Sequence, residues 1–434
     1  MNPPSLQHQL GVFSATLLGL GSILGTGIFV SIGLAAGIAG PAVVLAIALA
    51  AVVATFNALS SAQLAAAHPV SGGTYEYGCR YLSPLSGFMA GWMFLLAKSA
   101  SAATAALGFA GYTLAALGLG THWKLLVALA TVVCFTGIVL AGIRRSSQAN
   151  TAIVDLVVLA LLAFMAAGFS QQARGTSLAP AGPFFAGATL GDIVRNLLHA
   201  TALMFVAYTG YGRVATLAEE VREPRRTIPR AIVLTLVVSA LIYVGVATAA
   251  VGAVGAGFLH RATIEQGAPL ELALRAMGHP SLAWFITAGA AGAMLGVLLN
   301  LILGLSRVLL AMGRRGDMPA CMATIDARHA TPRMAVLAVG ILIAIITLWG
   351  SIKLAWSFSA FTVLIYYAIT NAAALAMPAE QRLYPRWIAM AGLASCLGLA
   401  FFVEPVVWLI GLGLALPGAL WWVAARWLQS PHRT

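Results

Sequence analysis

Residues 21–30 read GSILGTGIFV, and residues 205–212 read FVAYTGYG. Both stretches interrupt long hydrophobic segments with glycine and small polar residues. A glycine in a helix interior costs about 1 kcal/mol relative to alanine, and an unpaired backbone N–H or C=O group that faces lipid is costlier still. We therefore expect each break to line a binding site inside a membrane protein rather than to face lipid.

The two breaks suit a ligand that carries both charges. An opened helix offers free N–H groups and a positive dipole end to an anion, and free carbonyl oxygens to a cation. An amino acid zwitterion has both groups. The alternative is that the glycines only allow neighbouring helices to pack closely, as small residues do in many membrane helices.

The composition excludes a water-soluble globular domain. The chain has 434 residues, of which 61% are hydrophobic and 8% are charged, and its mean hydropathy is +0.94. A bilayer-spanning helix needs roughly 20 apolar residues, and runs of this length recur along the chain. The sequence therefore predicts an all-α polytopic membrane protein. Its twelve transmembrane helices are expected at residues 12–38, 41–67, 84–118, 124–142, 149–169, 193–218, 230–254, 281–306, 333–350, 354–376, 385–402 and 405–427.

The distribution of charge predicts the orientation of these spans. The first residues lack the Lys/Arg-rich region of a signal peptide, so we expect the first span to stay in the mature protein. Most of the 24 lysines and arginines fall in loops on one side of the membrane. The positive-inside rule then puts both termini in the cytoplasm of a protein in the cytoplasmic (cell) membrane. The net charge of +12 reflects this topology, and we expect no nucleic-acid partner.

Motifs for catalysis or metal binding are missing from the sequence. The four cysteines form no CxxC pair, the eight histidines form no HExxH pair, and there is no Walker A phosphate loop. We therefore expect no metal, no cofactor and no enzyme activity. A channel is disfavoured as well, because no carbonyl filter motif or repeated polar ring is evident.

Four stretches carry a resemblance to a known family. They are residues 21–30 (GSILGTGIFV), 69–92 (PVSGGTYEYGCRYLSPLSGFMAGW), 205–231 (FVAYTGYGRVATLAEEVREPRRTIPRA) and 306–319 (SRVLLAMGRRGDMP). In this order and spacing they resemble the amino acid-polyamine-organocation (APC) superfamily of permeases. The resemblance covers most of the chain and implies transport of amino acids or related amines by alternating access.

The resemblance also implies a leucine-transporter-type fold. In that fold two five-helix repeats have opposite orientation, and the first helix of each is discontinuous. The repeats map to residues 12–169 and 193–376, and helices 11 and 12 follow at residues 385–427. Residues 1–434 then form a single transporter domain. The span count agrees, because five is an odd number and the second copy must be inverted.

The resemblance assigns the substrate site to the backbone of the two breaks. The substrate carboxylate is expected at the amides of the first break, and the amino group at carbonyls of the second. The assigned residues are Ile23, Gly25, Thr26 and Gly27 in the first break, and Val206, Ala207, Tyr208, Thr209 and Gly210 in the second. The residues alone point the same way, because Gly27 begins a half-helix whose N-terminal N–H groups can receive an anion.

Charged residues at membrane depth are candidates for ion or proton coupling. Asp155 in the fifth span and Asn300 in the eighth are expected at a similar depth, near Ser22. Asp155 matches the position at which several proton-coupled relatives carry a lysine, so a lysine-based mechanism does not transfer to it. We expect Asp155 to bind H⁺ or Na⁺. Lys98 in the third span is expected to pair with carbonyls, to favour acidic substrates or to take part in proton coupling.

These observations predict secondary active transport of amino acids, with proton-coupled symport of neutral amino acids as the first expectation. No acidic side chain is visible near the breaks, which disfavours cationic substrates. An exchanger, a sodium-coupled permease and a non-transporting sensor of amino acids stay open as alternatives. The expected partners are the amino acid substrate and membrane lipids, and the expected assembly is a monomer or a homodimer.

Overall fold

The computed structural model describes residues 11–68, 72–142, 147–180, 182–212, 224–326 and 331–429. Helices dominate these residues, and the only β-type pairing among them is an isolated bridge between Asp326 and Thr331. The predicted all-α class is confirmed. In chain order the helices are α1 (Val12–Ile23), η1 (Gly27–Ser31), α2 (Ile32–Ala39), η2 (Gly40–Ala42), α3 (Val43–Ala67), α4 (Thr74–Tyr81), α5 (Pro84–Leu117), η3 (Thr121–Trp123), α6 (Lys124–Leu140), α7 (Ser147–Ala173), α8 (Leu190–Tyr208), η4 (Thr209–Tyr211), α10 (Pro224–Val254), α11 (Ala256–Glu265), α12 (Pro269–Ala276), α13 (Pro280–Arg314), η5 (Ala320–Ala323), α14 (Arg333–Thr347), α15 (Ile352–Ala376), η6 (Ala379–Gln381), α16 (Arg386–Ala400) and α17 (Pro405–Gln429).

The long helices are those of a membrane protein. Within the described ranges, nine helical stretches are long and apolar enough to cross a membrane, and α1, α14 and α16 are shorter apolar helices. The chain is therefore an integral, multi-pass membrane protein. Every range that the sequence analysis expects to span the membrane holds helix. The count of twelve crossings stays a prediction.

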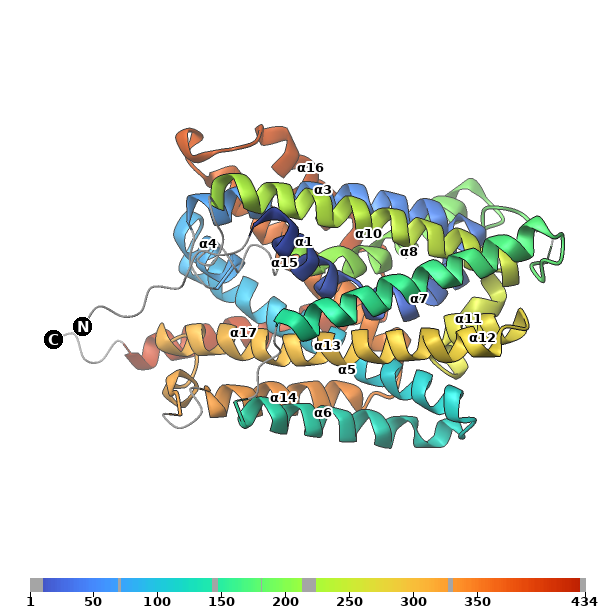
Figure 1. Ribbon diagram of the computed structural model, residues 1–434. Helices are drawn as coiled ribbons and strands as arrows, with labels where there is room; N and C mark the ends of the chain where they lie inside the picture. Colours follow the sequence, from blue (N-terminus) through green and yellow to red (C-terminus); the bar gives the residue numbers. More distant parts are fainter. Residues whose placement is uncertain are drawn as a thin grey trace.

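Helix α5 is the central helix of one half of the bundle. It packs against α4, α6, α13, α14, α15 and α17, and in Figure 1 α13 crosses in front of it. Alanine, glycine and serine dominate its middle, and small residues let neighbouring helix backbones approach closely. At Gly108, for example, an added Cβ atom would lie 2.9 Å from Met294 Sδ and 3.0 Å from Val30 Cγ2. The middle of α5 therefore makes its contacts inside the protein.

A second group of helices holds the two breaks. Helix α3 packs against both α8 and α10, α1 packs against α10, and α2 packs against α8. Figure 1 shows α3, α8 and α10 along one face of the bundle, with α1 close to them. Helix α1 also contacts α7 and α13. The broken helices therefore lie in the interior of the bundle.

The short helices mark the two ends of the bundle. Helix α4 lies at the end where α17 terminates, and α11 and α12 lie at the opposite end (Figure 1). In the predicted orientation both termini are cytoplasmic, so the end of the bundle that holds α4 and the end of α17 is then the cytoplasmic end. Helices α11 and α12 then form part of the external connection between α10 and α13.

The proline-containing segment after the second break differs from a simple polar loop. Residues 213–223 lie outside the described part of the chain, and the end of the predicted sixth span lies there too. From Pro224 onward the segment is helical, because α10 begins at this residue and contains Pro229. Pro224 is the first residue of the helix, where no N–H group needs an acceptor within the helix. Pro229 lies inside the helix, where it leaves one carbonyl of the preceding turn without its helical donor.

Candidate functional site

The first break lies between α1 and η1. Helix α1 ends at Ile23, and the chain leaves helical geometry at Leu24, whose ψ angle is 88°. The amides of Ile28 and Phe29 both donate to the carbonyl of Gly25, at 3.1 and 3.2 Å, where helix resumes as a π-helix. The first N–H groups of a helix have no preceding turn to bind. The amides of the new N-terminus, at Thr26 and Gly27, are therefore suited to an anion.

The second break lies between α8 and the short 3₁₀ turn η4. Helix α8 ends at Tyr208, and the Thr209 hydroxyl donates to the carbonyl of Val206 at 2.7 Å. The carbonyl of Thr209 accepts from the Tyr367 hydroxyl at 3.4 Å. The last carbonyls of α8 have no following α-helical turn, and the negative end of the helix dipole lies there. This end of α8 is therefore suited to a cation.

The two breaks touch each other through their backbones. A Cβ atom added at Gly210 would lie 2.3 Å from the carbonyl oxygen of Ser22, and one added at Gly27 would lie 2.4 Å from Cβ of Ala207. Real Cβ atoms do not approach other atoms so closely, so both positions require glycine. The N–H-rich break and the carbonyl-rich break are thus held side by side.

Tyr243 of α10 joins the two breaks. Its hydroxyl lies 2.7 Å from the carbonyl oxygen of Ile23 and 3.2 Å from that of Ala207. The side chain is fully buried, and its ring packs against Tyr208 with a centroid distance of 5.0 Å. A single donor therefore serves the terminal carbonyls of α1 and α8 together.

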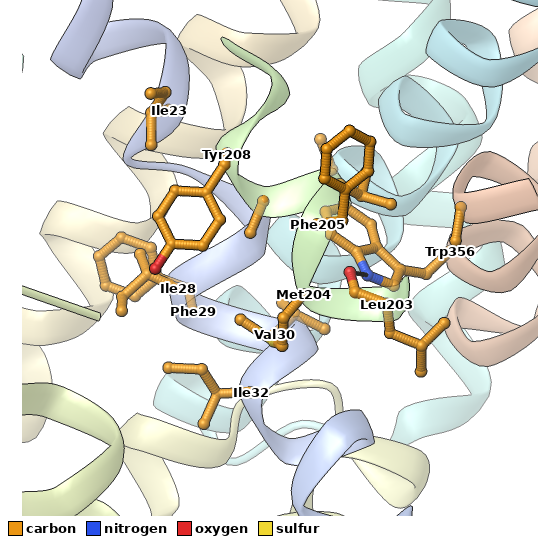
Figure 2. Close-up of a cluster of buried hydrophobic side chains, with 14 of the residues drawn as sticks. Ile23, Ile28, Phe29, Val30, Ile32, Leu203, Met204, Phe205, Tyr208 and Trp356 are labelled. Atoms are coloured by element: carbon orange, nitrogen blue, oxygen red, sulfur yellow. Dashed lines mark hydrogen bonds between the residues drawn. The ribbon is translucent and has the colours of Figure 1, made fainter. Parts of the chain in front are cut away.

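Buried hydrophobic side chains surround the breaks. Figure 2 shows Ile28 and Phe29 from the first break close to Tyr208 of α8, and Phe205 of α8 on the side toward Trp356. Trp356 of α15 closes one side, and its indole N–H donates to the carbonyl of Leu203 at 3.0 Å. Polar interactions are stronger in such apolar surroundings than in water. Interactions of the backbone groups of the two breaks with a charged ligand would therefore be stronger here than in water.

Lys98 lies beside the second break. This residue is near the middle of α5, is 8% exposed, and donates through Nζ to the Thr209 hydroxyl at 2.7 Å. Among the described residues no carboxylate forms an ion pair with it, and its single hydrogen-bond partner is this hydroxyl. The three roles that the sequence leaves open for Lys98 stay predictions. Next to Thr209 there is thus an ammonium group without a counter-charge in the described part of the chain.

Asp155 and Asn300 are not brought together by any hydrogen bond within the described residues. Asp155 is exposed on the stripe of α7 that also carries Leu159 and Leu162, which are 58% and 49% exposed. Asn300 is half-buried on α13, one turn from Val297, whose Cγ2 would lie 2.7 Å from a Cβ atom at Gly25. The coupling roles of both residues stay predictions, and Asp155 does not adjoin the break in this conformation.

Asn150 is the polar residue of α7 that does approach the first broken helix. A Cβ atom added at Gly21 would lie 2.8 Å from its side-chain oxygen. Asn150 is buried, and its side-chain nitrogen has no hydrogen-bond partner in the described part of the chain. It therefore occupies the place beside α1 that the sequence analysis assigns to Asp155.

Comparison with known proteins identifies the family. The family model described as amino acid permease matches residues 14–433. The chain belongs to this family. An uncharacterized transporter of Mycobacterium tuberculosis is 41% identical over 92% of this chain and 87% of its own length. The branched-chain amino acid permease BcaP of Bacillus subtilis is 32% identical over 76% of this chain and 72% of its own length. A methylthioribose transporter of Bacillus subtilis is 29% identical over 76% of this chain and 72% of its own length.

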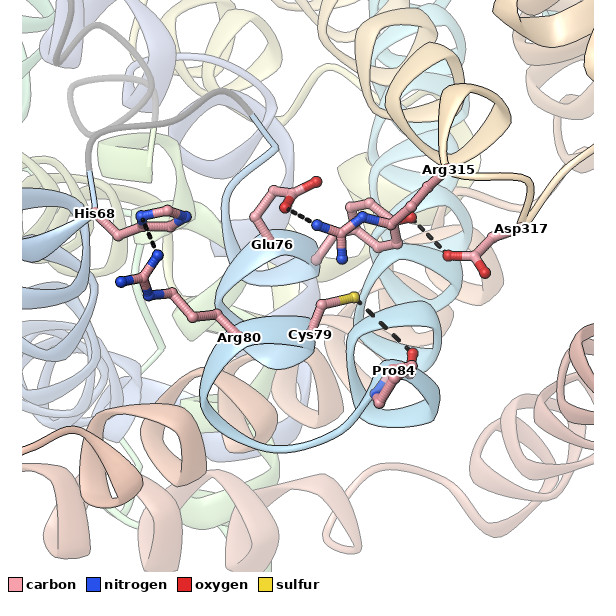
Figure 3. A network of polar contacts seen from close by, with 8 residues as sticks. His68, Glu76, Cys79, Arg80, Pro84, Arg315 and Asp317 are labelled. Atoms are coloured by element: carbon pink, nitrogen blue, oxygen red, sulfur yellow. Dashed lines mark hydrogen bonds and ion pairs between the residues drawn. The ribbon is translucent and has the colours of Figure 1, made fainter.

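The permease carries a polar network at the end of the bundle where α4 lies (Figure 3). The Tyr75 hydroxyl donates to the buried Asp317 carboxylate at 2.6 Å, and Arg315 pairs with Glu76 at 2.7 Å. The Arg315 guanidinium also lies over the Tyr75 ring, 5.6 Å from its centroid. Burial and the hydrogen bond to Asp317 raise the pKa of Tyr75. This network fixes α4 against the segment that follows α13.

A second side-chain contact extends from the same network. Arg80 donates to His68 at 3.2 Å (Figure 3). Burial lowers the pKa of His68, and the positive charges of Arg80 and Arg315 lower it further.

Helix α17 also contacts Asp317. The Trp421 indole N–H donates to the Asp317 carbonyl at 3.0 Å, and Arg426 lies 3.6 Å from the Asp317 carboxylate. Helices α4 and α17 are thereby joined through one buried carboxylate.

An ionic cluster lies at the opposite end of the permease. Glu404 precedes α17 and lies 3.0 Å from Lys353 of α15 and 3.4 Å from His199 of α8. Burial by itself raises the pKa of Glu404, but the hydrogen bonds and charges of His199 and Lys353 outweigh it and lower the pKa to about 2. Within the described residues no group of three or more His, Cys, Asp or Glu side chains is positioned to hold a metal ion.

Two residues of the permease site have no clear signal in the sequence. Tyr243 is a single tyrosine in an apolar helix, and its partners lie 220 and 36 residues away along the chain. Asn150 lies at the start of a span, where polar residues are ordinary. Only the packing of α10 and α7 against α1 reveals that both side chains face the breaks.

Proposed function

We propose that this permease carries amino acids across the membrane by secondary active transport with alternating access. The observation that supports this proposal is the direct contact between the two breaks, with amides at the start of η1 and carbonyls at the end of α8. These groups are complementary to the carboxylate and the ammonium group of one zwitterion. The substrate then lies across Ile23–Gly27 and Val206–Gly210.

The architecture that we propose for this activity has twelve transmembrane helices. Residues 12–169 and 193–376 form two inverted five-helix repeats, and residues 385–427 add two further helices. Both termini are cytoplasmic in this proposal. The breaks interrupt the first helix of each repeat partway along its length, which places the substrate near the midplane between the repeats. Alternating access then requires that one group of helices moves against another around the two breaks.

We propose neutral amino acids as the first substrates and a proton as the coupling ion. Within the described part of the second break no carboxylate is present to bind a cationic side chain. The named activity of one relative, a branched-chain amino acid permease, agrees with a neutral substrate. Asp155 and Asn300 are the proposed coupling residues. Exchange of amino acids and coupling to sodium are the alternatives.

The test is uptake into proteoliposomes that contain the purified full-length protein. A panel of radiolabelled amino acids is offered under an imposed proton gradient, an imposed sodium gradient or internal amino acid alone. Leucine, isoleucine or valine uptake driven by the proton gradient is the expected result. Uptake only with internal amino acid would establish an exchanger. Binding without uptake under any condition would favour a sensor.

Asp155 is tested in the same vesicles. Because its carboxylate is the proposed proton site, Asp155→Asn should abolish accumulation driven by the proton gradient while leaving exchange of internal for external leucine in place. Glu265→Gln on α11 is the matched control, because this exposed residue lies in the external connection. Equal accumulation by Asp155→Asn and the unaltered protein would remove Asp155 from the coupling mechanism.

A further inference from the structure

No carboxylate in the described part of the chain balances the charge of Lys98. The side chain is 8% exposed, and among the described residues its ammonium group has one hydrogen-bond partner, the Thr209 hydroxyl at 2.7 Å. An ammonium group has three N–H donors, so two of them are unused. A charge buried at membrane depth without a partner is costly and marks a functional position by default.

The acidic side chains in the described ranges either form ion pairs with other residues or face away from Lys98. Asp155 is exposed on the outer stripe of α7. Glu271 is fully buried but pairs with Arg275 on α12. Glu404 pairs with Lys353 and His199. The described protein therefore supplies no counter-anion for Lys98.

Contacts link Lys98 directly to the substrate site. Its partner Thr209 precedes Gly210, at which an added Cβ atom would lie 2.3 Å from the Ser22 carbonyl oxygen of the first broken helix. Thr209, Gly210 and Tyr211 form the single turn η4. The Lys98 ammonium group thus adjoins the turn that forms the second break.

We infer that Lys98 forms a subsite for a second carboxylate on the substrate, so that glutamate and aspartate are bound in addition to neutral amino acids. This inference rests on the proposed function and extends its substrate class. The α-carboxylate binds the amides of the first break, and the α-ammonium group binds the carbonyls at the end of α8. The side-chain carboxylate then meets Lys98, and the pair is neutral inside the membrane.

Glutamine and asparagine, the amide analogues of glutamate and aspartate, are the critical comparison for this inference. Glutamine has nearly the shape of glutamate but brings no negative charge to Lys98. Charged partners buried together typically lose a large part of their binding energy when one is removed. We expect glutamate to bind about 30-fold or more tightly than glutamine, and aspartate to exceed asparagine in the same way.

The experiment measures binding and competition with the full-length protein. Ligand-induced thermal stabilisation is recorded in detergent for glutamate, glutamine and leucine. In proteoliposomes, unlabelled glutamate and glutamine then compete with radiolabelled leucine. The inference predicts stronger stabilisation and competition by glutamate than by glutamine. This comparison needs no variant, so it holds even if a substitution at Lys98 prevents folding.

Variants assign the effect to the ammonium group. Lys98→Met keeps the length of the side chain and removes its charge, so the preference for glutamate over glutamine should fall to about threefold or less. Lys98→Arg keeps the charge and should retain a preference for glutamate. Lys124→Met makes the same change at the start of α6, away from the breaks, and should leave the preference unchanged.

The outcomes separate this inference from the proposed function. Leucine uptake together with equal or better competition by glutamine would overturn the Lys98 subsite and leave amino acid transport in place. A glutamate preference that survives in Lys98→Met would also overturn it. Neither binding nor uptake of any amino acid would overturn both proposals.

Discussion

Tyr243 offers a test at the scale of one hydroxyl group. Tyr243→Phe keeps the ring that packs on Tyr208 but removes the donor that lies between the carbonyls of Ile23 and Ala207. A buried acceptor left without a partner costs about 1–3 kcal/mol. We expect a lower midpoint of thermal unfolding in detergent and a slower maximal rate of amino acid uptake in proteoliposomes. The reason is that the two breaks lose the hydrogen-bond donor that they share.

The control for this substitution is Tyr384→Phe. Tyr384 is half-buried before α16, and no hydrogen bond of its hydroxyl joins it to the described part of the chain. Its removal should change neither unfolding nor uptake. A Tyr243→Phe protein with normal unfolding and normal uptake would show that the hydroxyl does not hold the breaks together.

Prediction at the residue scale depended on whether a signal was local. The glycines of the breaks are visible in the sequence because they interrupt apolar segments, and the structure shows that Gly27 and Gly210 have no room for a side chain. The direction of Asp155 was not predictable. In a helix that is apolar on every side, the face toward lipid and the face toward protein have similar side chains. The partner of Lys98 lies 111 residues away.

At the scale of elements, the contact between η4 and α1 is the feature to disturb. Gly210→Ala would place a methyl group against the Ser22 carbonyl, at 2.3 Å if nothing moved. Overpacking of this kind typically costs about 1–3 kcal/mol. Here the two breaks must also separate, and their amides and carbonyls then no longer fit one zwitterion. We expect uptake to fall at least about tenfold, measured as initial rate per inserted protein.

Gly137→Ala on α6 is the matched control. An added Cβ atom at Gly137 meets nothing within 4 Å among the described residues. Alanine favours helix over glycine by about 1 kcal/mol, so this variant should fold at least as well as the original protein and transport normally. Loss of uptake in both variants would mean that the effect of Gly210→Ala is not specific to the break.

The anchoring of α4 is a second prediction about elements. Tyr75→Phe removes the hydroxyl that donates to the buried Asp317 carboxylate at 2.6 Å. Hydrogen bonds to charged groups contribute about 1.5–3 kcal/mol, and the carboxylate would keep only the more distant Arg426. We expect a lower thermal unfolding midpoint. Tyr81→Phe, whose hydroxyl bonds exposed Gln381, should have a much smaller effect. Equal midpoints for the two variants would argue against a stabilising network at Asp317.

The elements themselves were largely readable from the sequence. The ranges predicted as spans all hold helix because runs of apolar residues fix their positions. The short helix α4 was not predicted, since it contains glycine and several polar residues. The helical start of α10 was also missed, because the predicted spans leave residues 219–229 outside the membrane helices. Both regions depend on contacts or helix-end effects that a hydropathy pattern does not report.

At the scale of the whole molecule, the sequence did not predict which helices are central in the bundle and which are peripheral. Helix α5 packs against helices on every side, yet its sequence is no more hydrophobic than that of α6 or α7, which are less buried. Lipid tails and protein interiors are both apolar, so hydropathy does not separate central helices from peripheral ones. The many small residues of α5 are the one sequence feature that suits its central place.

The attachment of the C-terminal helices to the core gives the last prediction. Glu404, just before α17, pairs with Lys353 of α15 and His199 of α8, and its pKa is lowered to about 2 from an ordinary value of 4.5. A carboxylate with a lowered pKa stabilises the folded state fully above its ordinary pKa. That contribution is lost as the pH falls from about 4.5 toward 2.

Glu404→Gln should therefore lower the thermal unfolding midpoint at pH 7, and the gap between variant and original protein should narrow at pH 3. Glu265→Gln on α11 is the control, because Glu265 is exposed and forms no ion pair within the described chain. Its midpoint should match that of the original protein at both pH values. If the gap for Glu404→Gln is absent at pH 7, or is equally large at pH 3, the ionised carboxylate does not fasten α17 to the core. The C-terminal helices would then be held by apolar packing alone.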